Sequence, residues 1–156
     1  MTKVRTTNSP SAAETEALGR HLALELQGGD VVLLEADLAA GKTTFVRGVV
    51  EGLGGEQAEV SSPTFVLIQS YECDRGAVRA LHHVDLYRLG ERVADLREIG
   101  IEDVLLDPAA VTAVEWPKGA IAAWIPNDAR VWRVAIQVEN DDTRTITVTP
   151  PNDDGS

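Results

Sequence analysis

The sequence of 156 residues predicts an α/β domain with three layers, in which helices flank a mixed, mostly parallel sheet. Two observations carry this prediction. Residues 31–34 are a short, continuous apolar run, which is typical of a strand buried on both faces of a parallel sheet. Apolar residues at helical spacing stand before and after this run, which indicates flanking helices. Short runs rich in β-branched residues come later and indicate further strands. The length suits one domain, expected over residues 1–149, and residues 150–156 are expected to be a disordered acidic tail.

The first half of the chain predicts a helix, a strand, a loop and a second helix. Ser11 and Glu14 are spaced as a capping box, and leucines at 18, 22 and 26 follow before two glycines. The strand at residues 31–34 ends at Glu35, and a loop then leads to Phe45 and further apolar residues at helical spacing. Glycines at 52 and 54 close that second helix.

The second half predicts mainly strands. Residues 60–64 should form a loop, and the runs 65–71 and 77–84 should form antiparallel strands joined by a turn at 73–76. Residues 86–106 are expected to be a helix broken by glycines at 90 and 100. We then expect a short strand at residues 111–114 and a short helix at residues 120–124. A final hairpin is expected to pair residues 130–138 with residues 144–149.

Charge and composition exclude several classes of function. Lys and Arg number 14 against 25 Asp and Glu, so the formal net charge of −11 disfavours tight direct binding to nucleic acid. One cysteine, Cys73, allows no internal disulfide and no zinc framework. The N-terminal residues lack the apolar stretch of a signal peptide, and the sequence contains no membrane-spanning run. We therefore expect a cytoplasmic protein without membrane contact.

The loop at residues 36–43 fits the phosphate-binding pattern of six residues followed by Lys and Ser/Thr, except that Ala36 replaces the first glycine. Such a loop wraps backbone N–H groups around phosphates at a helix N-terminus. Gly41, Lys42 and Thr43 supply the glycine, the cation for the terminal phosphates and the hydroxyl for Mg²⁺. Its place between a buried strand and an amphipathic helix disfavours a chance match. The sequence therefore predicts a P-loop NTPase that binds a nucleotide with Mg²⁺.

A magnesium nucleotide also needs an acidic group, and two acids stand at the ends of predicted strands. Asp85 follows residues 81–84, and Glu115 follows residues 111–114. Ligands of α/β sheets bind outside the carboxyl ends of the strands, where both side chains could approach the loop. Either carboxylate can hold the metal or orient a water. For each, a solvated loop acid is the alternative.

Five segments together resemble the TsaE family, the small bacterial P-loop ATPases of tRNA threonylcarbamoyladenosine biosynthesis. They are Asp37-Leu38-Ala39-Ala40-Gly41-Lys42-Thr43-Thr44, Ser62-Pro63-Thr64-Phe65, His83-Val84-Asp85-Leu86-Tyr87-Arg88-Leu89, Ile99-Gly100-Ile101 and Val114-Glu115-Trp116-Pro117. The resemblance covers nearly the whole chain. It implies an ATPase that acts on a complex of the threonylcarbamoyl transferase and its paralogous partner subunit. The partners would hold the tRNA, which is compatible with the acidic charge.

The resemblance also implies roles for individual residues. Lys42 would meet the β- and γ-phosphates, Thr43 would bind Mg²⁺, and Asp85 and Glu115 would lie at the metal, with Asp85 also near the attacking water. The remaining implied positions are the nucleotide-binding residues Asp37, Leu38, Ala39, Ala40, Gly41 and Thr44, the switch-like Ser62 and Thr64, and Trp116 beside the nucleotide or partner. Arg144 matches a late arginine of the family, although its place on a hairpin strand favours a solvated charge.

The phosphate loop departs from the family pattern at two positions, since Ala36 and Ala39 stand where glycine is usual. Ala39 adds a methyl group where the backbone must approach phosphate, which is expected to lower affinity or turnover. We predict that Ala39→Gly tightens ATP binding. An unchanged dissociation constant in calorimetry would contradict this prediction.

Two other functions use the same loop. A small-molecule P-loop kinase would phosphorylate an acceptor, and a nucleotide-binding scaffold with impaired hydrolysis would bind without turnover. The adjacent His82 and His83 should face opposite sides of a strand, so they cannot form a two-histidine metal site. His83 is expected to be a strand histidine whose polar atoms find partners, although its place in a family motif puts it near the site.

Overall fold

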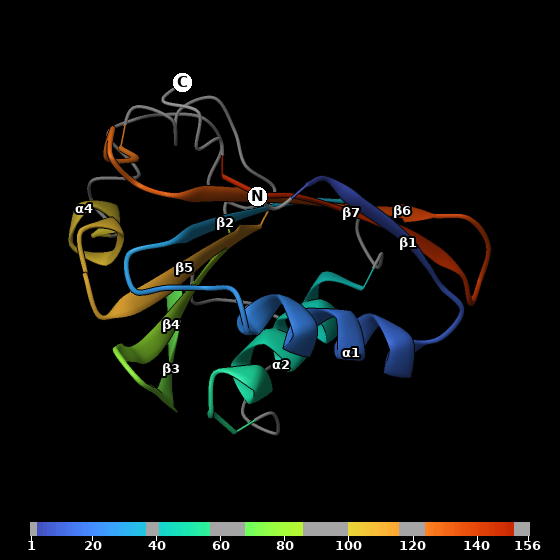
Figure 1. Ribbon diagram of the computed structural model, residues 1–156, viewed down its shortest axis with the longest axis horizontal. Helices are drawn as coiled ribbons and strands as arrows, with labels where there is room; N and C mark the ends of the chain where they lie inside the picture. Colours follow the sequence, from blue (N-terminus) through green and yellow to red (C-terminus); the bar gives the residue numbers. More distant parts are fainter. Residues whose placement is uncertain (1–2, 37–40, 57–67, 86–99, 116–123, 152–156) are drawn as a thin grey trace.

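A seven-stranded sheet forms the centre of the described chain, which comprises residues 3–36, 41–56, 68–85, 100–115 and 124–151 of a computed structural model (Figure 1). The strand order is β1-β7-β6-β2-β5-β4-β3. The strands are β1 (Arg5–Ser9), β2 (Val31–Ala36), β3 (Ile68–Arg75), β4 (Val78–Asp85), β5 (Ala110–Glu115), β6 (Val131–Val138) and β7 (Arg144–Thr149). The described helices are α1 (Ala12–Ala23), α2 (Lys42–Gly52) and α4 (Ile101–Leu105).

The sheet is mixed, but the expectation that it is mostly parallel is wrong. Three neighbouring pairs, β6–β2, β2–β5 and β5–β4, are parallel, and three, β1–β7, β7–β6 and β4–β3, are antiparallel. The two hairpins and the N-terminal strand add antiparallel neighbours on both sides of a parallel centre. Strand β2 lies in this centre, and its residues Val31 to Leu34 are at most 4% exposed, as the apolar run predicted.

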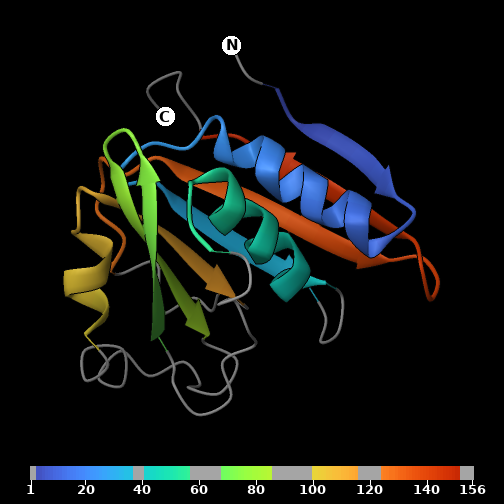
Figure 2. The same cartoon turned by 90° about the horizontal axis from the view of Figure 1, so that it is seen from below.

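Helices cover both faces of the sheet. Helices α1 and α2 lie side by side on one face, as Figures 1 and 2 show from two directions, and α4 packs on the other. The alternation of side chains along β2 divides the core: Val32 and Leu34 belong to the α1–α2 side, and Val31 and Leu33 to the α4 side. This arrangement agrees with the three layers that the sequence predicted. No helix among the described residues is long and apolar enough to cross a membrane.

The predicted helices and strands are confirmed in type where they lie in the described residues, but several bounds differ. Helix α1 ends at Ala23, so Leu26, which was expected in this helix, lies beyond it. Ser11 caps α1 as expected, because its side chain accepts a hydrogen bond from the N–H of Glu14 at 3.2 Å. Strand β1 was not predicted. Strand β2 runs on to Ala36, and β3 runs through Cys73 to Arg75, so the hairpin turn comes later than 73–76. The predicted segments at 60–67, 86–99 and 120–123, and the tail beyond 151, lie outside the described residues.

A buried carboxyl group ties the start of β2 to β6. Asp30 is 1% exposed. One of its oxygens accepts hydrogen bonds from the N–H of Gln27 at 2.9 Å and from the indole of Trp132 at 3.0 Å. The other oxygen lies 3.1 Å from Nε of Arg130. Burial nevertheless raises the pKa of Asp30 above its ordinary value of 3.8, because the loss of hydration outweighs these partners.

The raised pKa gives Asp30 a defined effect on stability. A carboxyl group whose pKa is higher in the folded state binds its proton more tightly there, so its contribution falls as pH rises from the unfolded pKa through the folded one. We expect the unfolding free energy of the wild type, minus that of Asp30→Asn, to fall as pH rises from about 3.8 and then to level off. Urea unfolding of both proteins across this range measures the difference. A difference that grows with pH would contradict the assignment.

Candidate functional site

The connection from β2 to α2 has the geometry that the phosphate-binding pattern requires at its two described ends. Strand β2 ends at Ala36, and α2 begins at Lys42 directly after Gly41. Gly41 has φ of 103°, a left-handed conformation that side chains disfavour, although a Cβ there would meet only a methyl group of Thr15 at 3.8 Å. The backbone conformation, and not a lack of space, therefore favours glycine. Gly41 is the N-cap residue of α2 and has no side chain that could cap the helix.

Lys42 is a buried cation that reaches back from the helix to the end of the strand. Its side chain is 7% exposed. The ammonium group donates a hydrogen bond to the carbonyl of Ala36 at 3.4 Å, and it lies 3.8 Å from Oε1 of Glu115. The carboxylate thus offsets part of the cost of burying the ammonium charge.

Two carboxylates stand at the carboxyl ends of adjacent parallel strands. Asp85 ends β4, Glu115 ends β5, and these residues are direct partners in the strand register. Glu115 is also the register partner of Leu34 in β2. Both acids are largely buried, with 9% and 5% of their surface exposed. The fold thus brings both acids predicted at strand ends to the edge from which α2 starts.

His83 joins this group from within β4. It is fully buried, and its Nε2 contacts Oε2 of Glu115. An ionised carboxylate can only accept, so the Nε2–H of His83 donates this hydrogen bond. Nδ1 of His83 has no hydrogen-bond partner among the described residues. The expectation that the polar atoms of His83 find partners holds for Nε2 and, within the described part of the chain, is wrong for Nδ1. The sequence did not indicate that Glu115 would be the partner; the spacing of two from Asp85 indicated only that His83 and Asp85 share a face of the strand.

His82 faces the other side of the sheet, as predicted, and belongs to a different group. Its Nδ1 lies 2.7 Å from Oγ of Ser70, and its Nε2 lies 3.0 Å from Oδ2 of Asp107. The hydrogen bond with His82 is the largest of the contacts that lower the pKa of Asp107. These contacts link β3 and β4 to the segment before β5.

The donor set at the edge suits a hard cation that also binds phosphate. Within the described ranges, no three His, Cys, Asp or Glu residues are grouped so that they could hold a metal ion alone. Mg²⁺ does not need such a cage, because it is usually held by one or two carboxylates, phosphate oxygens and water. Asp85 and Glu115 supply the carboxylates, and Thr43 stands in the first turn of α2. The residues present therefore fit a nucleotide-bound Mg²⁺.

The other predicted site residues divide into three groups. Thr44 lies in the first turn of α2. Arg144 begins β7 at the edge where β6 ends, and its Nη1 donates to the carbonyls of Asn140, Asp141 and Thr143 at 2.8, 3.3 and 3.2 Å. It therefore braces the β6–β7 turn, and its nucleotide contact stays a prediction. Seven predicted residues lie outside the described ranges: Asp37, Leu38, Ala39, Ala40, Ser62, Thr64 and Trp116.

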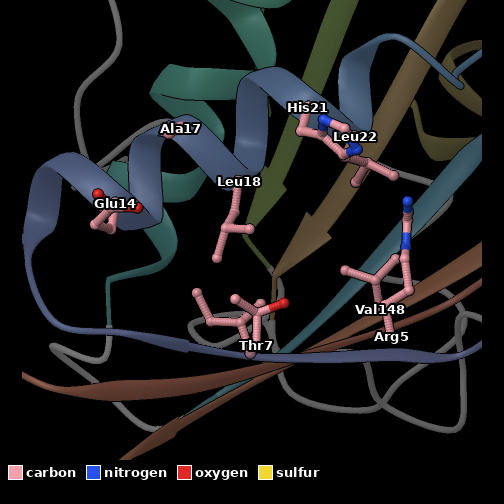
Figure 3. Close-up of a pocket in the computed structure, with 9 residues that line it drawn as sticks. Arg5, Thr7, Glu14, Ala17, Leu18, His21, Leu22 and Val148 are labelled. Carbon is pink, nitrogen blue, oxygen red and sulfur yellow. The ribbon is translucent and has the colours of Figure 1, made fainter.

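A cavity of about 360 Å³ lies elsewhere, between α1 and strands β1 and β7 (Figure 3). Apolar side chains, including Leu18 and Leu22, share its lining with Arg5, Glu14 and His21. Lys42, Asp85 and Glu115 are not among the residues that line it. The cavity is thus separate from the candidate site.

Comparisons with known proteins agree on one family. The family model described as "Threonylcarbamoyl adenosine biosynthesis protein TsaE" matches residues 9–146. A curated protein of Streptomyces coelicolor named "tRNA threonylcarbamoyladenosine biosynthesis protein TsaE" is 39% identical, over 85% of this chain and 87% of its own length. Proteins with the same name from Bacillus subtilis and Treponema pallidum are 38% and 36% identical, over 87% and 90% of this chain and 79% and 96% of their own lengths.

A solved structure has a similar fold. The crystal structure of Bacillus subtilis YdiB superposes with a TM-score of 0.67 and 33% sequence identity. The superposition covers 97% of this chain and 88% of the YdiB chain.

Proposed function

Because the chain belongs to the TsaE family of tRNA threonylcarbamoyladenosine biosynthesis, we propose that it is a Mg²⁺-dependent ATPase with a P-loop NTPase fold. One observation carries the proposal. Lys42, at the start of the helix that follows β2, is buried beside Glu115, and Glu115 is paired with Asp85 at the ends of two parallel strands. Such an edge combines a fixed cation, a helix N-terminus and two acids, which are the groups that a magnesium nucleotide requires.

Each group has a distinct task in this proposal. The N–H groups in the first turn of α2 and the ammonium of Lys42 bind phosphate oxygens, and Lys42 offsets the negative charge that develops on the transferred phosphoryl group. Thr43 and one of Asp85 and Glu115 would hold Mg²⁺, which would neutralise phosphate charge. The other carboxylate would orient the attacking water. Burial of the charged groups strengthens these interactions, because little water screens them.

The family and the charge support a proposal for the partners. We propose that the chain acts in the cytoplasm on the complex of the threonylcarbamoyl transferase and its paralogous subunit. The net charge of −11 disfavours direct tRNA binding, so the partners hold the tRNA. Hydrolysis of ATP would then serve repeated rounds of tRNA modification.

The test is phosphate release from Mg-ATP by this chain mixed with the transferase and its paralogous subunit from the same organism. We expect free phosphate to appear with all three proteins and to disappear when Mg²⁺ is chelated. Transfer of phosphate to an acceptor molecule instead would identify a kinase. Nucleotide binding without turnover in the complete mixture would identify a scaffold that has lost hydrolysis.

A further inference from the structure

The two oxygens of Glu115 have different partners. Oε1 lies 3.8 Å from the ammonium of Lys42, and Oε2 is in contact with Nε2 of His83. The carboxylate is therefore held from both sides, by a cation from α2 and by a ring from the neighbouring strand β4. A glutamate side chain has three rotatable bonds, so two fixed contacts greatly restrict where its oxygens can lie.

The histidine is well placed to act as the fixed side of this pair. His83 is fully buried within β4, between β3 and β5 in the sheet, so packing restricts its ring. Lys42, on the other side of the Glu115 carboxylate, is the first residue of α2, where phosphate is proposed to bind. The contact with His83 thus occupies Oε2 of Glu115, and Oε1 is the oxygen that lies on the nucleotide side.

We propose that His83 is a positioning residue, which holds Glu115 through Oε2 so that Oε1 faces Lys42 and the nucleotide-bound metal. The inference rests on the proposed function, since it assigns the orientation of a carboxylate in that same site. It follows the general rule that carboxylates which bind metals are themselves held by outer hydrogen bonds. His83 itself touches neither the nucleotide nor the metal in this proposal.

The test separates the hydrogen bond from the volume of the ring. His83→Phe keeps a buried ring but removes the donor, whereas the amide nitrogen of His83→Gln can stand in for Nε2. His83→Asn has the same amide group on a shorter side chain, which cannot reach Glu115. The matched control is His82→Phe, the same change at the adjacent residue on the opposite face of β4. Calorimetry measures the dissociation constant of a non-hydrolysable ATP analogue, once with Mg²⁺ and once with EDTA.

We expect His83→Phe and His83→Asn to weaken binding with Mg²⁺ by about 10- to 100-fold, the usual effect of losing an outer partner of a metal ligand. Binding in EDTA should stay unchanged, His83→Gln should restore most of the Mg²⁺ effect, and His82→Phe should behave as the wild type. Circular dichroism shows whether His83→Phe folds. If it does not, the comparison of His83→Gln with His83→Asn tests the same point, since only His83→Asn should weaken binding with Mg²⁺.

Two results would overturn the inference while leaving the proposed function standing. In one, the wild type binds the analogue better with Mg²⁺ than with EDTA, and His83→Phe and His83→Asn bind it with Mg²⁺ as tightly as the wild type does. In the other, the variants lose the same affinity with Mg²⁺ and with EDTA, which would indicate a purely structural role. A wild type whose binding does not respond to Mg²⁺ would overturn the proposed function and this inference together.

Discussion

Lys42→Ala is expected to lower the rate of phosphate release from Mg-ATP by about 10²- to 10³-fold, the typical loss when one preorganised electrostatic donor is removed from an active site. The physical reason is the position of the charge. The ammonium is buried at the start of α2, and the structure directs it to the edge where Asp85 and Glu115 end their strands. Alanine provides no cation there, so the negative charge on the transferred phosphoryl group loses its fixed partner.

The control is Lys3→Ala, which removes the same charge from an exposed residue ahead of β1. Its rate should match that of the wild type. Lys42→Ala must also remain folded, because the variant leaves the buried Glu115 without its cation. Circular dichroism and urea unfolding check this point. A folded Lys42→Ala protein with more than about a tenth of the wild-type rate would contradict the role of Lys42 in charge stabilisation.

Gly48→Ala is expected to lower the free energy of unfolding by about 1–3 kcal/mol, the typical cost of forcing an extra group into a close-packed contact. Helices α1 and α2 approach each other at their glycines. A Cβ on Gly48 would lie 2.0 Å from the carbonyl oxygen of Glu16 and 3.0 Å from the N–H nitrogen of Arg20. These atoms belong to the backbone of α1, so they cannot move aside as a flexible side chain would, and the two helices must separate.

The same shift should reach the proposed nucleotide site, because α2 begins with Lys42 and Thr43. We therefore expect ATP affinity to fall together with stability. The comparison is Gly76→Ala in the β3–β4 turn, where a Cβ would meet nothing within 4 Å but φ is +56°. That variant carries only the backbone penalty of roughly 1 kcal/mol. If urea unfolding shows Gly48→Ala to be as stable as Gly76→Ala, the close contact between the helices is not as described.

The centre of the fold was predictable because its signals are local. The apolar run at Val31 to Leu34 can be satisfied only by burial on both faces, and β2 is indeed flanked by two parallel strands. The capping pattern at Ser11 likewise depends on residues three apart. For the candidate site, the loop pattern and the acids at strand ends were enough to indicate that Lys42, Asp85 and Glu115 share one edge.

The remaining features depend on contacts between distant segments. Strand β1 carries Arg, Thr and Asn with three exposed positions, so no apolar alternation marks it, and its pairing with β7 defines it. The turn between β3 and β4 is set by Gly76 in a left-handed conformation, which lets β3 continue beyond Cys73. The contact of His83 with Glu115 follows from the register of β4 and β5, which no local pattern specifies.

The most direct test of the central claim, that the carboxyl edge of β2, β4 and β5 binds a magnesium nucleotide, is a crystal structure with Mg²⁺ and a non-hydrolysable ATP analogue. We predict a β- or γ-phosphate oxygen within hydrogen-bond distance of Lys42 Nζ, and a metal ion bound by Asp85 or Glu115. A nucleotide bound elsewhere, for example in the cavity between α1 and strands β1 and β7 in Figure 3, would contradict the claim.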